Sequence, residues 1–185
     1  MKNKTLKISF VLLFIGQILY AQSARTFIKG TNIVGETPTS GFAVYIEIFN
    51  VSYSTTNDRL ITTQPVLNKP NEKAQTGVLS FKKIKSKNSQ IFFDIMRGSV
   101  SDGFTDVEIA FAKFIPNSYH TYLNFKAKNV RVLSIKDNGD FTETIELLMP
   151  KVFIFYRPTN PTTGQLDPPI NYGWDFLTYA AWNGS

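Results

Sequence analysis

The chain has 185 residues, no cysteine, one histidine and a formal net charge of +6 from 20 basic and 14 acidic residues. The lack of cysteine excludes a disulfide framework, a thiol nucleophile, a thiolate metal site and a lipid anchor on cysteine. Three of the lysines lie in the first 23 positions, which leaves 17 basic against 14 acidic residues, a net charge of +3. This excess is too small to indicate a nucleic-acid or membrane-surface partner.

The first residues have the pattern of an export signal. Three lysines precede an apolar run over residues 8–15, and small residues follow at Ala21 and Ser23. The run is shorter than the roughly 20 residues of a membrane-spanning helix, even when it is extended to Leu19. The pattern predicts a signal peptide over 1–23, cleaved after Ala21 or Ser23, and a secreted or periplasmic protein without stable membrane insertion. An uncleaved anchor is the alternative.

The remainder of the chain reads as one domain. About 160 residues can bury a substantial core, and no repeat or compositional break divides them. We expect a domain over 24–178 and a frayed C-terminal tail over 179–185.

Most of this domain is predicted to be β-structure. Apolar and polar residues alternate over 44–49 and 106–111, which is typical of strands with one face inward. Over 121–135 the alternation changes phase, so a bulge or bend is expected near Asn129. Asn138-Gly139 suits the positive φ angles of a tight hairpin turn. Two further strands are expected in the segments that end at Pro150 and Pro158, because proline cannot donate to a strand ladder.

One amphipathic helix is predicted within residues 86–99. Ile91, Phe92, Ile95 and Met96 recur at helical spacing, with Ser86 as the expected N-cap and Gly98 at the C-terminal end. Between Tyr53 and Gly77 lies a long polar segment, which we interpret as functional or as an extra hairpin around 60–63.

Several segments, taken in order, resemble the haemolysin-coregulated protein (Hcp) family, the inner-tube subunits of the type VI secretion system. These are "TFIKGTNIVGET", "AVYIEIFNVSYS", "LSFKKIKSKNSQIFFDIMRG", "FTDVEIAFAK" and "TETIELLMPKVFIFYRPTNPTTGQLDPPINYGWDF". The residues that carry the family motifs are Phe81, Lys82, Ser86, Phe92, Gly98, Thr142, Glu143, Tyr156, Gly173, Trp174 and Asp175.

The resemblance implies a mainly β fold, a partly open β-barrel of two sheets with one flanking α-helix. It also implies a structural protein rather than an enzyme, without cofactor or metal. Its subunits would associate into hexameric rings that stack head to tail, with secreted effectors and a spike protein as further partners. Tube subunits of the family carry no export signal and many have a longer glycine-rich connection at 137–140, so the chain is expected to be a secreted relative. A secreted monomeric binding module, using residues 54–76 and exposed aromatic side chains, is the alternative.

Two pairs of polar residues suggest catalytic chemistry. Ser118 and His120 would share a face of an extended segment, as a nucleophile and its base would, although a triad also needs an orienting carboxylate. Asp106 and Glu108 are spaced roughly 7 Å apart on a strand, as the paired acids of a glycosidase can be. A loop histidine and a solvated strand face are the favoured interpretations, and Glu143 and Glu146 fall on different faces. A hydrolase is therefore the weakest hypothesis.

Aromatic residues gather near the C-terminus. Tyr172, Trp174 and Phe176 would share one face of an extended segment, and Tyr179 and Trp182 follow. They suit a ligand platform or burial. The resemblance favours burial, with Trp174 as a closing core residue, Gly173 letting the chain turn inward and Asp175 turning it outward.

Overall fold

The computed structural model describes residues 24–55, 76–98, 103–115, 117–160 and 162–185. The expected signal peptide over 1–23 and the hairpin around 60–63 lie outside these residues. The elements in order are β1 (Arg25–Gly30), β2 (Ile46–Ser54), β3 (Gly77–Ile84), α2 (Ser89–Met96), β4 (Phe104–Ile115), β5 (Ser118–Asp137), β6 (Thr142–Met149), β7 (Lys151–Tyr156), β8 (Ile170–Asp175) and β9 (Ala180–Ala181).

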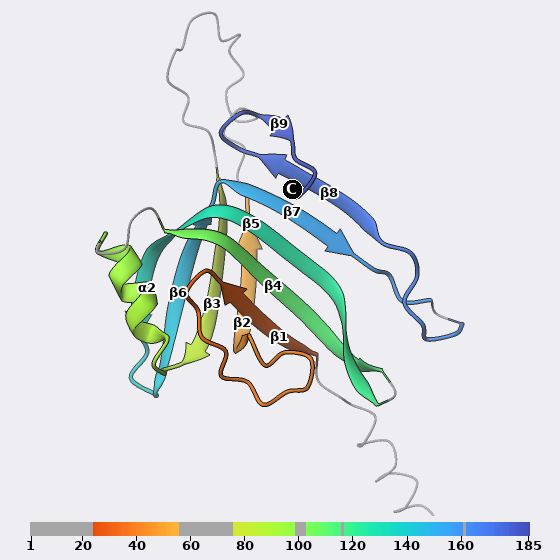
Figure 1. Cartoon of the computed structure of the whole chain (residues 1–185), viewed down its shortest axis with the longest axis horizontal. Helices are drawn as coiled ribbons and strands as arrows, with labels where there is room; N and C mark the ends of the chain where they lie inside the picture. Colours follow the sequence, from red (N-terminus) through yellow and green to blue (C-terminus); the bar gives the residue numbers. More distant parts are fainter. Residues whose placement is uncertain (1–23, 56–75, 99–102, 116, 161) are drawn as a thin grey trace, which may run out of the picture.

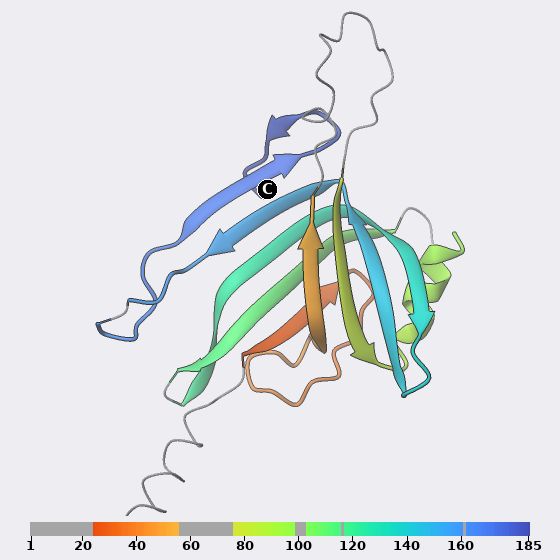
Figure 2. The ribbon, with the colours of Figure 1, turned by 180° about the vertical axis from the view of Figure 1, so that it is seen from behind.

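Six strands form a barrel. All pairings are antiparallel, and β1 pairs β2, β2 pairs β3, β3 pairs β6, β6 pairs β5, β5 pairs β4 and β4 pairs β1, which closes the ring. Viewed from behind, β2, β3 and β6 form one wall, and β1, β4 and β5 cross it as the other (Figure 2). The expected mainly β fold with one flanking helix is confirmed.

Strand β5 belongs to both walls because it bends at Asn129. The residues up to Val130 pair with β4, those from Leu123 to Lys128 also pair with β7, and those from Arg131 onward pair with β6. Asn129 has φ of 56°, a left-handed conformation that asparagine tolerates better than most residues. The bend predicted near Asn129 is therefore confirmed.

Beyond the barrel, β7, β8 and β9 extend one sheet into an arm (Figure 1). The prediction of a frayed tail over 179–185 is wrong for residues 180–182. Ala180 and Ala181 form β9 against Asp175 and Trp174, and the amide of Trp182 donates to the carbonyl of Gly173 at 3.1 Å.

The core fills the barrel and continues under the helix. Ile28, Ile109, Phe125 and other inward residues are buried as the period-two pattern predicts. Phe92 of α2 is fully buried and makes edge contacts with Phe81 and Phe104, at ring distances of 6.1 and 5.3 Å. The helix thus covers the barrel at a point far from the arm (Figure 1).

A smaller apolar cluster lies outside the barrel. The segment over 31–45 crosses the outer face of β1 and β4, where Phe42 stacks on Phe27 with ring centroids 4.1 Å apart. Val44 precedes β2 and is exposed, so the inward pattern begins at Ile46 rather than at Val44.

Two local predictions need correction. Asn88, not Ser86, is the N-cap of α2, and it makes no side-chain cap hydrogen bond. In the hairpin between β5 and β6 the positive φ angles belong to Gly139 and Phe141 rather than to Asn138 and Gly139, because the connection spans 138–141 and is longer than a two-residue turn. Gly98 does have the expected positive φ, 71°, just after the helix.

Candidate functional site

A buried ion pair anchors the helix to the barrel wall. Lys83 and Glu143 are directly opposite each other on β3 and β6, and Lys83 Nζ lies 2.9 Å from Glu143 Oε1. Their side chains are only 2% and 7% exposed. A buried charge is stable only when it is paired and hydrogen-bonded, so this position is structurally demanding.

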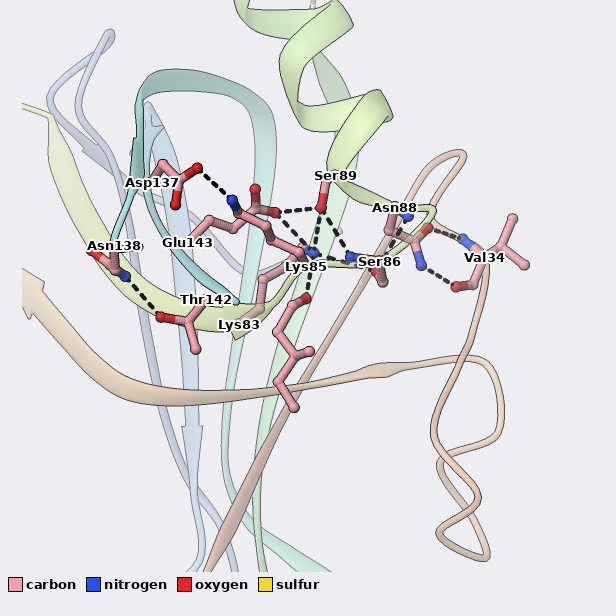
Figure 3. A network of polar contacts seen from close by, with 11 residues as sticks. Val34, Lys83, Lys85, Ser86, Asn88, Ser89, Asp137, Asn138, Thr142 and Glu143 are labelled. Carbon is pink, nitrogen blue, oxygen red and sulfur yellow. Dashed lines mark hydrogen bonds and ion pairs between the residues drawn. The ribbon is translucent and has the colours of Figure 1, made fainter. Parts of the chain in front are cut away.

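Hydrogen bonds complete the network around this pair (Figure 3). Lys83 Nζ donates to the carbonyl of Ile84 at 2.9 Å, to Ser86 Oγ at 3.3 Å and to Ser89 Oγ at 3.1 Å. Ser89 Oγ donates to Glu143 Oε1 at 2.7 Å. Because Ser89 is the first residue of α2, the ion pair fixes the position at which the helix begins.

The same network holds the segment over 31–45. The side-chain amide of Asn88 donates to the carbonyl of Val34 at 2.7 Å and accepts from its amide at 2.9 Å (Figure 3). The function of this network is therefore to join the helix, the barrel and the crossing segment. Lys82, the neighbouring motif residue, lies on the opposite face of β3 from Lys83.

A second polar cluster lies on the outer face of β1, β4 and β5. Glu108 Oε2 pairs with Lys29 Nζ at 2.9 Å, while Glu108 Oε1 accepts from the Tyr45 hydroxyl at 3.0 Å and from Asn124 Nδ2 at 2.6 Å. Burial alone would raise the pKa of Glu108, but the hydrogen bonds from Lys29, Asn124 and Tyr45 outweigh it and hold that pKa below 4.5. Burial raises the pKa of Tyr45.

This geometry argues against Glu108 as a catalytic acid. Asp106 and Glu108 both line one groove beside Lys29, as the hydrolase hypothesis requires. A general acid of a glycosidase needs a raised pKa, whereas the pKa of Glu108 is lowered. The buried Val107 and Ile109 lie on the opposite face, as the favoured interpretation predicts.

Ser118 and His120 do come together. Ser118 Oγ lies 2.8 Å from His120 Nε2, and both side chains are exposed at the start of β5. Within the described part of the chain no carboxylate hydrogen-bonds to His120, so the orienting member of a triad is missing. Nowhere in the described part of the chain do three or more histidine, aspartate or glutamate side chains lie together as a metal site would require.

The C-terminal aromatic residues differ from expectation. Trp174 is 41% exposed, so its prediction as a closing core residue is wrong. Trp174 pairs with the buried Val152 of β7, so its face of β8 continues the inner face of the barrel sheet. Phe176 is partly buried and packs against the main core.

Gly173 and Asp175 also have roles other than those predicted. A Cβ on Gly173 would lie 2.3 Å from the carbonyl oxygen of Trp182 and 2.7 Å from Phe153, so the glycine permits close packing of the tail rather than an inward turn. Asp175 is buried, pairs with Lys151 at 2.8 Å and accepts from the amides of Leu177 and Thr178. The hydrogen bond from Lys151 is the main reason that the pKa of Asp175 is lowered.

The surface of the described residues carries two groups of exposed apolar side chains. The arm patch consists of Tyr156, Ile170, Tyr172 and Trp174, on one face of β7 and β8. The hairpin patch consists of Phe49, Ile84 and Phe141. Phe49 and Ile84 line one groove, and Phe141 lies on the β5–β6 hairpin, where its carbonyl accepts from the amide of Lys85. Large contiguous apolar patches on a soluble protein usually mark interaction surfaces.

Solved structures share the overall fold of this chain. Hcp1 from Salmonella typhimurium superposes with a TM-score of 0.67 at 16% identity, covering 86% of this chain and 99% of the other. A type six secretion system protein superposes with a TM-score of 0.69 at 19% identity, covering 86% and 100%. The chain has the Hcp fold. A type VI secretion system effector from Yersinia pestis shares it with a TM-score of 0.58 at 15% identity, covering 81% and 98%.

The similarity to known proteins is seen in the structure and not in the sequence. No protein-family model and no curated protein matches the chain. Within the residues that the structure describes, no helix is long and apolar enough to cross a membrane.

Proposed function

We propose that this protein is a structural, ring-forming subunit of the Hcp type, which associates through identical contacts into hexameric rings. The rings stack and carry secreted effectors, and a spike protein is a further partner. The protein acts outside the cytoplasm, as a secreted or periplasmic relative of the tube subunits. Neither catalysis nor nucleic-acid binding is part of this function.

One observation carries the proposal: the similarity covers 99% of the Hcp1 chain and 100% of the type six secretion system protein. A fold alone does not determine function, so the proposal also depends on surfaces suited to assembly. A ring closed by rotation needs a heterologous contact, in which one surface of each subunit meets a different surface of the next.

The arm patch and the hairpin patch meet this requirement. Figure 1 places the arm and the β5–β6 hairpin at different ends of the molecule, so one subunit can offer each patch to a different neighbour. The arm patch extends an already buried sheet face, because Ile154 pairs with Tyr172 and Val152 with Trp174. We propose that the arm of one subunit packs on the hairpin patch of the next.

The mass of the purified protein in solution tests this proposal. Multi-angle light scattering across a wide concentration range is expected to give six times the subunit mass. A clean monomer at all concentrations would instead favour the second candidate, a secreted monomeric binding module. The groove described below is the observation that favours that candidate.

A further inference from the structure

Asn124 of β5 carries an unsatisfied acceptor. The residue is 9% exposed, and within the described ranges its Oδ1 is the one buried side-chain polar atom without a hydrogen-bond partner. The amide orientation is fixed by Glu108, because a reversed amide would place Oδ1 against the carboxylate that Nδ2 now contacts at 2.6 Å. Nearly all buried polar atoms in native proteins are hydrogen-bonded, so Oδ1 calls for a donor.

The side chain of Asn124 lines a groove on the outer face of β5 and β7. The groove has a volume of about 420 Å³, and its lining includes His120, Lys126, Phe153, Phe155 and Arg157. Asn124 lies directly opposite Phe155, and Lys126 directly opposite Phe153, on the paired strands. An amide and an ammonium group therefore each lie beside an aromatic ring.

The charge of the groove is positive. Glu108, its one acidic residue, is paired with Lys29. Lys126 is exposed, and no hydrogen bond or ion pair joins it to another described residue. Arg157 uses Nε for the carbonyl of Asp167 at 3.3 Å, which leaves its terminal nitrogens for another acceptor. A carboxylate suits these two cations.

We propose that this groove binds an extended acidic peptide segment of another protein. On binding, the groups that cover Asn124 Oδ1 move aside and a backbone amide of the peptide donates to this atom. The carboxylate of the peptide contacts Lys126 and Arg157, and an adjacent apolar side chain packs on Phe153 and Phe155. A simple anion does not fit, because it has neither a hydrogen for Oδ1 nor an apolar part for the rings. The groove faces away from the arm patch, so this inference does not depend on ring formation.

Saturation-transfer NMR on the purified protein tests the proposal, because it detects weak ligands whatever the size of the assembly. The probe is acetyl-Asp-Phe-amide, with acetyl-Asn-Phe-amide and sodium acetate as comparisons. We expect saturable transfer from the acidic dipeptide, at least fivefold weaker binding of the neutral one, and no saturable transfer from acetate. Equal binding of both dipeptides, saturable acetate binding, or no saturable transfer from any probe would overturn the proposal.

Two variants localise the binding. Lys126→Gln and Asn124→Leu are each expected to weaken binding of the acidic dipeptide at least fivefold, while Lys136→Gln, an exposed lysine on the far half of the same strand, leaves it unchanged. Circular dichroism checks that each variant is folded. Unchanged binding by folded Lys126→Gln and Asn124→Leu would place the peptide elsewhere and refute the assignment.

Discussion

Lys83 Nζ lies 2.9 Å from Glu143 Oε1, across a directly opposed pair of β3 and β6, and Ser89 of the helix bonds to both. Removal of one partner leaves the other charge buried without compensation. We expect Glu143→Leu to lower the free energy of unfolding by about 3–5 kcal/mol, measured by chemical denaturation.

Two further variants distinguish loss of pairing from loss of packing. The double variant Lys83→Met/Glu143→Leu is expected to recover most of the stability, because it leaves no unpaired charge. Lys85→Ala, which breaks the exposed ion pair with Asp137, is expected to cost at most about 1 kcal/mol. A Glu143→Leu effect no larger than that of Lys85→Ala would contradict the anchoring role.

The sequence contained part of the signal for this network. Alternation over Leu79, Phe81 and Lys83 places Lys83 inward, yet a lysine at an inward position is normally read as a strand end. Its partner could not be predicted, because the pairing of β3 with β6 joins residues 60 positions apart in sequence. Ser86 has the residue type of an N-cap, but its hydroxyl accepts from Lys83 and from the amide of Asn88 instead.

The strands were predictable because alternation depends only on local sequence, and Asn129 was found because the phase of that alternation changes. The exposure of Trp174 could not be predicted, because the alternation within a strand does not reveal whether another sheet covers that face of the strand. The groove around Asn124 depends on three strands and was likewise invisible, although asparagine at a position between apolar neighbours was an available signal.

The Lys29–Glu108 pair predicts an acid-sensitive contribution to stability. The pKa of Glu108 is lower in the folded protein than its ordinary value of 4.5, so its contribution is complete above pH 4.5 and is lost as the pH falls through the folded pKa. We expect Glu108→Gln to be less stable than wild type at pH 7, with the difference shrinking at pH 3. Urea denaturation at both pH values measures this, and a pH-independent difference would contradict it.

Tyr53 is expected to resist ionisation. Burial, with a smaller contribution from Tyr172, raises the pKa of Tyr53 to about 12, so its stabilising contribution is present below pH 10 and is lost as the pH rises through 12. Ultraviolet titration should show one fewer tyrosine ionising above pH 11.5 in Tyr53→Phe than in wild type, with no difference near pH 10. A difference near pH 10 would mean that Tyr53 is accessible.

Gly173 is expected to be required for docking of the C-terminal tail. A Cβ at this position meets the backbone of Trp182 at 2.3 Å, so Gly173→Ala must displace the tail or the ring of Phe153. We expect a loss of about 1–3 kcal/mol in the free energy of unfolding. Asn171→Ala, on the same face of β8 and exposed, is the matched control and should differ little from wild type.

Substitution of the apolar patches tests which surfaces join the subunits. Trp174→Ser on the arm and Phe141→Asn on the hairpin are each expected to convert hexamer to monomer, because either change removes one side of the proposed contact. Asparagine suits position 141, since it tolerates the positive φ of 59° found there. Phe93→Ser, which changes an exposed aromatic residue of α2 outside both patches, should leave the hexamer intact. Light scattering gives the masses and thermal unfolding checks the fold. A folded Trp174→Ser variant that remains a hexamer would show that the arm patch is not the contact, because the exposed indole is the largest group that the arm offers to a neighbour.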